Sequence, residues 1–255
     1  MSTTGASFIT DKPAPPIARE GWPILAGFVV VSLGATTAAA WAHPIAGAVV
    51  GPAALILTLW AFWFFRDPAR RIPADPELIL CPADGVICQI VPASPPPELG
   101  LTPEQTQGMT RVSVFMNVFN VHVNRAPAAA RVRRVEHKPG SFLNAAFEKA
   151  SEQNERCSLL LELPDRRLLP VVQVAGLVAR RIVCRVKPGA VLGRGERFGI
   201  IRFGSRVDTY LPAGVTASVR VGERVIAGET VLASLRVESA ETDRQAQRDP
   251  ALAGG

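Results

Sequence analysis

Two long apolar runs near the N-terminus dominate the hydrophobic pattern of the chain. The runs Ile24–Ala42 and Ile45–Phe65 contain no charged residue, and only His43 and Pro44 separate them. Each run is close to the ~20 residues that a helix needs to cross the hydrocarbon core of a bilayer. The pattern therefore predicts a tight helical hairpin in a membrane, preceded by a polar tail over residues 1–23.

The charges that flank this hairpin predict its orientation. Lys12 and Arg19 precede the first run, and Arg66, Arg70 and Arg71 follow the second. Because basic residues accumulate on the cytoplasmic side of a membrane, we expect both ends of the hairpin, and the remainder of the chain, to face the cytoplasm at the cell (inner) membrane. Aromatic residues crowd the end of the second run, as in an interfacial belt: Trp60, Phe62, Trp63, Phe64 and Phe65. A buried core helix and a signal peptide remain as alternatives.

From Leu78 onward the pattern changes to short apolar stretches separated by Gly and Pro, which predicts strands. One helix is expected over residues 141–155, where Ser141 can cap a segment with apolar positions at three-to-four spacing. The fold class is therefore α+β and mainly β, an antiparallel sandwich-like domain with few helices behind the hairpin. The predicted strands are Leu78–Cys81, Val86–Val91, Val112–Val118, Leu159–Leu163, Val171–Val174 and Ile182–Val186.

A weak internal repeat lies in the second half of the chain. Residues 189–196 and 222–229 each place a second Gly six residues after the first and follow it with Glu. We interpret each as a hairpin between strands, as in lipoyl-carrier-like sandwiches. Such carriers need a lysine at a hairpin tip, and the second segment has none, while Lys187 precedes the first.

The net charge of +6 and the Arg-rich composition fit three kinds of partner: nucleic acid, an anionic membrane surface or an acidic substrate. The four cysteines, Cys81, Cys88, Cys157 and Cys184, lack CxxC spacing and neighbouring histidines. We therefore expect reduced structural thiols and neither a metal site nor a disulfide framework.

The pair Gly204-Ser205 offers a specific chemistry. Glycine permits strained backbone angles and leaves its carbonyl open, and the hydroxyl of the following serine can reach that carbonyl through a five-membered ring. An N-to-O acyl shift then gives an ester. Loss of its carboxylate by β-elimination would leave dehydroalanine, which hydrolyses to a pyruvoyl group and ammonia.

Several segments in the same order resemble the phosphatidylserine decarboxylase family in its short form. The segment 203–208, Phe-Gly-Ser-Arg-Val-Asp, is similar to the processing site of the family, and the resemblance covers roughly residues 60–235. Ser141 and Asn120 stand where lysine and aspartate are common in the family. The other matching segments are 65–68, 82–85, 120–127, 140–145, 154–156 and 175–182.

The resemblance implies that Ser205, His122 and Asp84 form the catalytic group. A serine needs a base, histidine has a pKa near the working pH, and a carboxylate can fix the histidine tautomer. His43, in the hairpin, and His137, in a charged and loop-like stretch, are weaker candidates for the base.

The resemblance also implies a domain layout. The hairpin spans residues 24–65, the catalytic domain spans residues 66–238, and a flexible tail covers residues 239–255. Cleavage between Gly204 and Ser205 would give chains 1–204 and 205–255, which remain together as a heterodimer and can assemble further.

The implied reaction turns phosphatidylserine into phosphatidylethanolamine, through a Schiff base between the substrate amine and the pyruvoyl group at position 205, with His122 as the source of the returning proton. No metal and no nucleic acid are expected to take part. Guanidinium groups bind phosphate well, so candidates to hold the lipid phosphate are Arg125, Arg180, Arg181 and Arg202.

Two other functions stay open. A pyruvoyl-dependent decarboxylase of a soluble amino acid would share the chemistry of Ser205 without needing the hairpin. A membrane-tethered carrier or binding module without enzymatic activity would leave the chain uncleaved.

Overall fold

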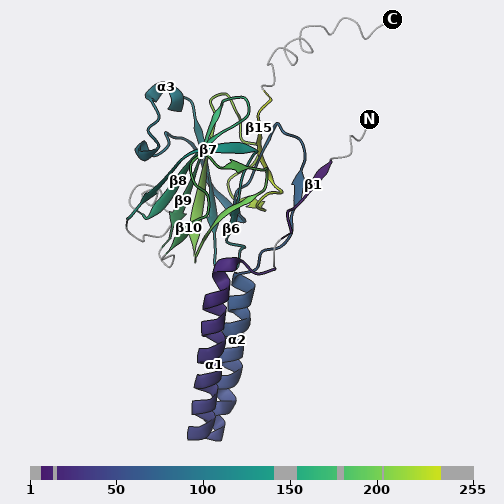
Figure 1. The fold of residues 1–255 in the computed structure, drawn as a ribbon, viewed down its shortest axis with the longest axis vertical. Coiled ribbons are helices and arrows are strands. Elements are labelled where there is room, and N and C mark those ends of the chain that lie inside the picture. Colours follow the sequence, from purple (N-terminus) through teal and green to yellow (C-terminus); the bar gives the residue numbers. More distant parts are fainter. Residues whose placement is uncertain (1–6, 14–15, 141–153, 177–180, 203, 237–255) are drawn as a thin grey trace, which may run out of the picture.

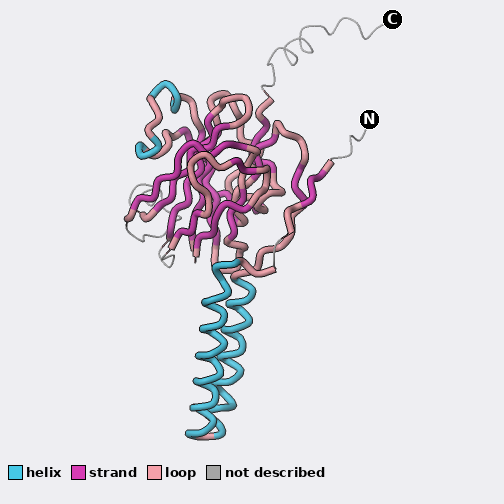
Figure 2. Tube along the Cα trace, in the orientation of Figure 1, coloured by secondary structure: helices cyan, strands magenta, loops and turns pink. Residues whose placement is uncertain are grey.

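The structure, a computed structural model, describes residues 7–13, 16–140, 154–176, 181–202 and 204–236. A pair of antiparallel helices projects from one end of a domain built mainly of strands, as Figures 1 and 2 show. The expected α+β, mainly β class with an N-terminal helical hairpin is confirmed.

The hairpin consists of α1 (Trp22–Ala42) and α2 (Pro44–Phe64). His43 is the single extended residue between them, and its Nδ1 accepts a hydrogen bond from the N–H of Ile45 at 3.2 Å. The ring therefore caps the first turn of α2, where Pro44 lacks an N–H that would need a partner. His43 has a structural role at the tip of the hairpin.

The two helices pack closely but bury little of their surface. The hydroxyl groups of Ser32 and Thr58 lie 2.9 Å apart across the interface. A Cβ at Gly47 would lie 2.6 Å from Cβ of Ala40, so the backbones meet where glycine allows it. Only 6% of each apolar stretch is buried in the structure, and both are long enough to cross a membrane. They are therefore not core helices of the domain.

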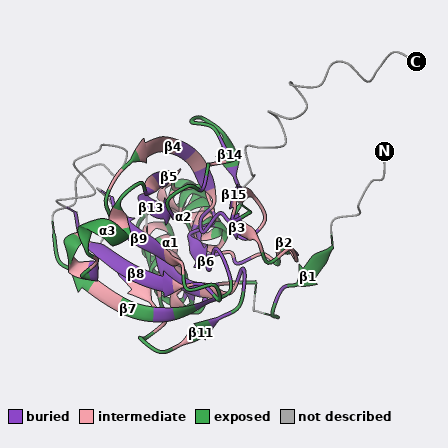
Figure 3. Cartoon of the chain, turned by 90° about the horizontal axis from the view of Figure 1, so that it is seen from above, coloured by how far each residue is buried: buried purple, intermediate pink, exposed green. Residues whose placement is uncertain are grey.

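The domain is built around a curled antiparallel sheet of eight strands in the order β11-β7-β8-β9-β13-β5-β4-β14. Figure 3 shows its central strands β8 and β9 largely buried. The bounds are β4 (Gly85–Pro92), β5 (Thr110–Met116), β7 (Ala130–Lys138), β8 (Arg156–Glu162), β9 (Leu168–Ala175), β11 (Val191–Leu192), β13 (Ser205–Leu211) and β14 (Arg224–Val225).

A three-stranded sheet β10-β12-β6 and two strand pairs, β1-β2 and β3-β15, complete the described strands. All six predicted strands are present, with ends shifted by a few residues. The bounds are β1 (Phe8–Thr10), β2 (Arg71–Pro73), β3 (Leu78–Leu80), β6 (Val123–Arg125), β10 (Ile182–Cys184), β12 (Arg197–Ile201) and β15 (Val231–Ser234). Short helices are η1 (Arg19–Gly21), η2 (Pro97–Leu99) and α3 (Pro103–Thr106).

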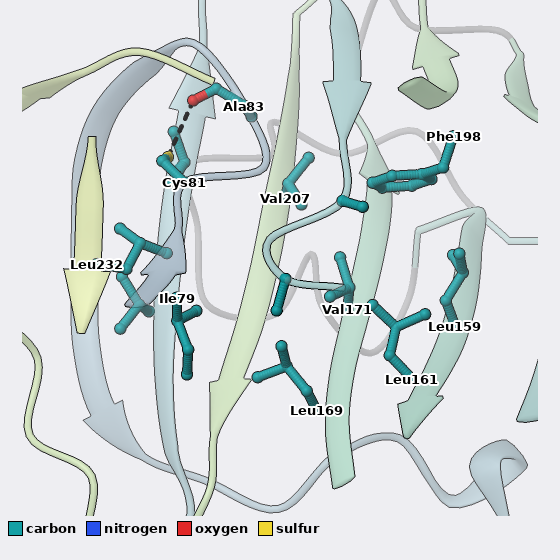
Figure 4. Close-up of a cluster of buried hydrophobic side chains, with 14 of the residues drawn as sticks. Ile79, Cys81, Ala83, Leu159, Leu161, Leu169, Val171, Phe198, Val207 and Leu232 are labelled. Atoms are coloured by element: carbon teal, nitrogen blue, oxygen red, sulfur yellow. Dashed lines mark hydrogen bonds between the residues drawn. The ribbon is translucent and has the colours of Figure 1, made fainter. Parts of the chain in front are cut away.

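The main core lies inside the curled sheet. Alternate residues of β13, among them Val207 and Leu211, point into it together with Val171 of β9 and Leu159 of β8. Figure 4 shows Val207, Val171 and Leu159 among the side chains of this cluster. Burial of these apolar groups stabilises the fold, and it fixes the register of β13 because a one-residue slip would turn them outward.

A second apolar cluster joins the hairpin to the domain. Leu25 at the start of α1 and Phe64 at the end of α2 pack with Val123 of β6 and Ile200 of β12. The base of the hairpin is therefore anchored against the three-stranded sheet, which puts this sheet at the end of the domain next to the helices (Figure 1).

The repeated glycine segments are related by an approximate twofold arrangement rather than being hairpins. Gly189 and Gly222 both have φ of 90°, a left-handed conformation that favours glycine. The N–H of Gly189 donates a hydrogen bond to the carbonyl of Val132 at 2.7 Å, and the N–H of Gly222 donates to the carbonyl of Ile87 at 2.8 Å. The short strands that follow, β11 and β14, pair with β7 and β4 instead of with their neighbours in the chain. The expectation of two local hairpins was therefore wrong.

The same approximate twofold symmetry relates residues 80–87 and 125–132, the two segments that the glycine segments contact. The N–H of Leu80 donates to the carbonyl of Pro127 at 2.8 Å, and the N–H of Arg125 donates to the carbonyl of Pro82 at 2.9 Å. These reciprocal bonds align residues 80–87 with residues 125–132. In that alignment Asp84 corresponds to Ala129, so only one half of the repeat carries this carboxylate.

The polar segment before the hairpin is partly integrated into the domain. β1 pairs with β2, and Asp11 is buried among basic residues of the domain. The stretch 133–138, expected to be loop-like, belongs to strand β7, which pairs with β8. Residues 141–153 of the predicted helix, and the predicted tail 239–255, lie outside the described residues.

Candidate active site

Ser205 is the first residue of β13 and lies between two strands, opposite Met116 of β5 and Ala175 of β9. The residue is completely buried, and its hydroxyl oxygen has no hydrogen-bond partner among the described residues. Gly204 precedes it with φ of 54°, in the left-handed region. A buried hydroxyl without a partner is energetically costly, and this state makes Ser205 a candidate for a functional role.

His122 is also completely buried, immediately before β6. Its Nδ1 lies 2.9 Å from the carbonyl oxygen of Asn120, and its Nε2 has no hydrogen-bond partner in the part of the chain that is described. A carbonyl only accepts hydrogen bonds, so Nδ1 carries the proton and Nε2 has the free lone pair. The ring of Phe64 packs on the imidazole with 4.2 Å between ring centroids.

Burial keeps this imidazole neutral. It lowers the pKa of His122 to about 4, against the hydrogen bond to Asn120, and the positive charge of Arg66 lowers the pKa further. At neutral pH the histidine is therefore unprotonated at Nε2 and can take a proton.

Strand contacts bring Ser205 and His122 to the same end of the domain. The carbonyl of His122 accepts a hydrogen bond from the N–H of Ile201, four residues before Ser205 in the chain, at 3.3 Å. Met116, which lies opposite Ser205, receives a contact from the amide of Asn124 at 3.8 Å. The hydroxyl of Ser205 and Nε2 of His122 are not hydrogen-bonded to each other.

Asp84 occupies the turn that leads into β4, as its Asp-Gly sequence predicts. Both of its carboxylate oxygens lie 2.9 Å from the guanidinium of Arg70, and one accepts the N–H of Ala227 at 2.8 Å. The carboxylate therefore binds Arg70 rather than the imidazole of His122. The expectation that Asp84 fixes the tautomer of His122 is not met in this geometry, because the carbonyl of Asn120 has that role.

Arg125 is a structural residue instead of a phosphate ligand. Its guanidinium is buried and binds Asp11 at 3.0 Å and Asp67 at 3.2 Å, and Arg197 shares both carboxylates. Two backbone carbonyls, of Pro68 and Gly195, accept further hydrogen bonds from it. A guanidinium enclosed in this way cannot reach a lipid head group.

Two of the other predicted phosphate ligands, Arg181 and Arg202, lie near the start of β10. Arg180 falls outside the described residues, and Arg181 is exposed. Arg202 is half-buried, its backbone N–H donates to the carbonyl of Arg181 at 3.3 Å, and its side-chain Nε has no partner within the described chain. Arg181 and Arg202 are therefore adjacent in space, and Arg202 lies three residues before Ser205 in the chain.

Two residues near the site were not predicted to take part in it. Arg70 holds Asp84, and Arg66 donates hydrogen bonds to the carbonyls of Trp63 and Phe119. Both were visible in the sequence only as charges after the second apolar run. A flanking charge indicates orientation in a membrane, and only tertiary contacts show that Arg70 binds Asp84 and that Arg66 binds the loop before His122.

The four cysteines are free thiols, but two of them are not isolated. Cys157 and Cys184 line one cavity together with His137 and Glu155. A side-chain interaction between the two thiols lowers the pKa of Cys184 and raises the pKa of Cys157. His137 lies 3.0 Å from Glu155, half exposed and on a different strand from the Ser205 region. Among the described residues, no His, Cys, Asp and Glu side chains form a group of three or more that could hold a metal ion.

The site thus combines a buried serine after a left-handed glycine with a buried, neutral histidine at the base of the apolar hairpin. The sequence of the chain was compared with models of known protein families. The model of one family, phosphatidylserine decarboxylase, matches residues 57–233. The match begins within α2, includes His122 and Ser205, and extends into β15. More than half of the chain is covered, and the chain therefore belongs to the phosphatidylserine decarboxylase family.

Proposed function

We propose that the chain is a self-cleaving decarboxylase that converts phosphatidylserine into phosphatidylethanolamine in phospholipid biosynthesis. Decarboxylase activity follows from the family. The observation that supports the finer proposal is the state of Ser205, a buried hydroxyl without a partner directly after a left-handed glycine. A neutral imidazole with a free Nε2 lies at the same end of the domain.

Cleavage begins with attack of the Ser205 hydroxyl oxygen on the carbonyl carbon of Gly204, while Nε2 of His122 takes the hydroxyl proton. The C–N bond breaks, the nitrogen is protonated, and an ester links the two residues. Loss of the α-proton of Ser205 then expels the carboxylate of Gly204 and leaves dehydroalanine. Water hydrolyses this group to a terminal pyruvoyl group and ammonia.

The sheet supports the integrity of the cleaved protein. After cleavage, β13 would belong to the chain 205–255, while its neighbours β5 and β9 would belong to the chain 1–204. Seven residue pairs join β13 to β5, and five join it to β9. The two chains would therefore remain one heterodimer held by a central strand.

In the mature enzyme, position 205 at the start of β13 would hold the pyruvoyl group, whose ketone would supply the electron sink for loss of carbon dioxide from an amine substrate. Phe64 keeps the imidazole of His122 oriented, and we assign to His122 the proton that returns to the substrate carbon. Asp84 and Arg70 stabilise the adjoining turn as an ion pair.

The lipid substrate accounts for the hairpin. α1 and α2 would insert into the cell (inner) membrane with the domain on the cytoplasmic side, as the flanking basic residues indicate. The site would then lie close to the lipid head groups, and tethering would raise the effective concentration of substrate at the site.

Intact mass spectrometry of the purified protein tests the proposal. We expect two chains, of which the smaller begins at position 205 with a blocked pyruvoyl end. Ser205→Ala should remain a single chain without activity. Ser113→Ala is the matched control, because Ser113 is another completely buried serine without a hydroxyl partner among the described residues, on the neighbouring strand β5. This variant should cleave normally.

The substrate is tested separately by comparing carbon dioxide release from phosphatidylserine and from free amino acids. Release from phosphatidylserine alone is expected. A cleaved protein that acts only on a free amino acid would favour the soluble-substrate alternative, and an active protein that stays uncleaved would contradict the mechanism.

A further inference from the structure

We propose that Arg66 binds the phosphodiester of the phospholipid substrate at the membrane side of the active site. This inference rests on the proposed function and adds the residue that positions the head group. It replaces Arg125, whose guanidinium is enclosed by carboxylates.

Arg66 lies at the level where lipid phosphates are expected. α2 ends at Phe64, two residues earlier, so Arg66 directly follows the apolar helix. Its guanidinium lies over the ring of Trp63 at 4.2 Å from the centroid, and 57% of Trp63 is exposed. Tryptophan and arginine at a helix end are typical of the interface between hydrocarbon and head groups.

The guanidinium of Arg66 is held in place by backbone carbonyls, but its charge is not paired with a carboxylate in the described chain. It donates to the carbonyl of Trp63 at 2.7 Å and to the carbonyl of Phe119 at 2.8 Å. Within the described residues, no carboxylate lies within 4.0 Å of it, in contrast to Arg70, Arg125 and Arg197 of the same region. Its remaining N–H groups are therefore available to an anion, and guanidinium binds phosphate oxygens through paired, charge-assisted hydrogen bonds.

Arg66 and His122 are held by one short loop. The carbonyl of Phe119 accepts a hydrogen bond from Arg66, and the next carbonyl, of Asn120, faces Nδ1 of His122. Phe64, two residues before Arg66, packs on the imidazole. A phosphate bound at Arg66 would therefore place the attached serine head group beside the imidazole.

The loop also offers an apolar contact for the lipid. The side chain of Phe119 is 63% exposed and lies in the segment whose carbonyl binds Arg66. Trp63 and Phe119 are thus both exposed aromatic residues that contact the guanidinium, Trp63 through its ring and Phe119 through its backbone carbonyl. A phosphate between an arginine and exposed aromatic rings, at the end of an apolar hairpin, fits an anionic phospholipid better than a free phosphate ion, which has no apolar part.

The experiment compares Arg66→Ala, Arg66→Lys and Arg19→Ala in fully cleaved preparations of the whole chain. Arg19 is an exposed basic residue just before α1, whereas Arg66 follows α2. Removal of Arg19 therefore controls for general attraction between basic residues at the hairpin base and anionic lipid. The substrate is dihexanoyl phosphatidylserine in solution, where attraction to a bilayer does not contribute. Dihexanoyl phosphatidylglycerol, which carries the phosphodiester but no amine, serves as a competing ligand, and dihexanoylglycerol serves as its phosphate-free control.

For Arg66→Ala we expect KM to rise about tenfold, equivalent to about 1.4 kcal/mol, with a smaller change in kcat. The inhibition constant of phosphatidylglycerol should rise by a similar factor, whereas that of dihexanoylglycerol should not change. Arg66→Lys should recover part of the loss, and Arg19→Ala should behave as wild type.

Unchanged KM and unchanged inhibition by phosphatidylglycerol in Arg66→Ala would overturn the inference while the proposed function stands. An equal loss in Arg19→Ala would also overturn it, because the effect would then be general surface charge. Wild-type protein that cleaves but does not act on phosphatidylserine would instead contradict the proposed function itself.

Discussion

His122 is a histidine whose environment removes the charge that it would carry in mildly acidic water. A free imidazole has a pKa near 6.5, and burial lowers that of His122 to about 4. Ser205 is buried in the same way, without a partner for its hydroxyl in the described chain. Each residue alone costs folding free energy, since a buried polar atom without a hydrogen bond is destabilising. The occurrence of two such destabilising residues at one end of the domain supports a functional role for the pair.

The pH dependence of cleavage should report on this environment. We expect the rate of self-cleavage to stay constant from pH 8 to pH 6 and to fall as pH approaches about 4, where the imidazole becomes protonated. Rates measured after a pH jump on freshly translated chain test this, and His122→Gln should abolish cleavage at every pH. A midpoint near 6.5 would show that His122 is solvated instead.

The same shift predicts how stability depends on pH. The folded-state pKa of His122 lies below the unfolded value, so the unfolded chain takes up a proton first as pH falls. The contribution of His122 to stability is therefore complete above about pH 6.5 and is lost progressively between about pH 6.5 and about pH 4. In Ser205→Ala, which cannot cleave, replacing His122 by Gln should flatten this part of the thermal-stability profile.

At the scale of elements, a buried charge network connects the N-terminal segment with the domain. Asp11, just after β1, accepts hydrogen bonds from the backbone N–H of Arg70 and from the side chains of Arg125 and Arg197. Asp67, just after α2, binds the same two guanidinium groups. The network therefore fixes both the segment before the hairpin and the segment after it against β6 and β12.

Asp11→Ala should destabilise the protein strongly. Removing one partner of a buried ion pair leaves an uncompensated charge and costs about 3–5 kcal/mol. In detergent, this corresponds to a decrease in Tm of roughly 10 °C for a domain of this size. Lys12→Ala is the matched control in the neighbouring position, because its ion pair with Glu196 is exposed and its loss should shift Tm little. Equal shifts for the two variants would show that the network does not stabilise the fold.

At the scale of the molecule, the helices and the domain perform separable tasks. The base of the hairpin is part of an apolar cluster with β6 and β12. The distal parts of the two helices project away from the domain and lie against each other (Figure 1). Exposed apolar side chains such as Trp41, at 91% exposure, would be unfavourable in water and favourable in lipid. The proposed tether is therefore the distal part of the hairpin.

Removing residues 31–56 and closing the hairpin with a short glycine-rich turn should separate these tasks. Leu25 and Phe64 stay in the cluster, so we expect self-cleavage and activity on short-chain phosphatidylserine to persist. Activity on vesicles should fall at least tenfold, because the effective lipid concentration at the site is lost. Flotation assays should find the shortened protein outside the membrane fraction. Full activity on vesicles would show that the hairpin is not required for lipid access.

Local features of the fold could be predicted from the sequence. The two apolar runs, the six strands and the residues Gly204, Ser205 and His122 were all visible, because apolar periodicity, chain-breaking residues and a reactive dipeptide are properties of neighbouring positions. The proposed processing chemistry of Gly204-Ser205 is local in the same sense, since it would need only a glycine carbonyl and the next hydroxyl. The strand order, the burial of Asp11 and the twofold relation of the glycine segments depend on residues far apart in the chain.

The sequence by itself thus determined the helical hairpin and the mainly β domain, and it pointed to Ser205 as the candidate for the reactive serine. Only the tertiary structure decided the roles of the charged groups. Arg125, one of many arginines in the sequence, is enclosed by two carboxylates, Asp84 binds Arg70, and Arg66 faces the loop of His122 without a carboxylate within ion-pair distance in the described chain. The physical reason is that an ion pair depends on which distant side chains share a buried volume, and no local pattern encodes that proximity.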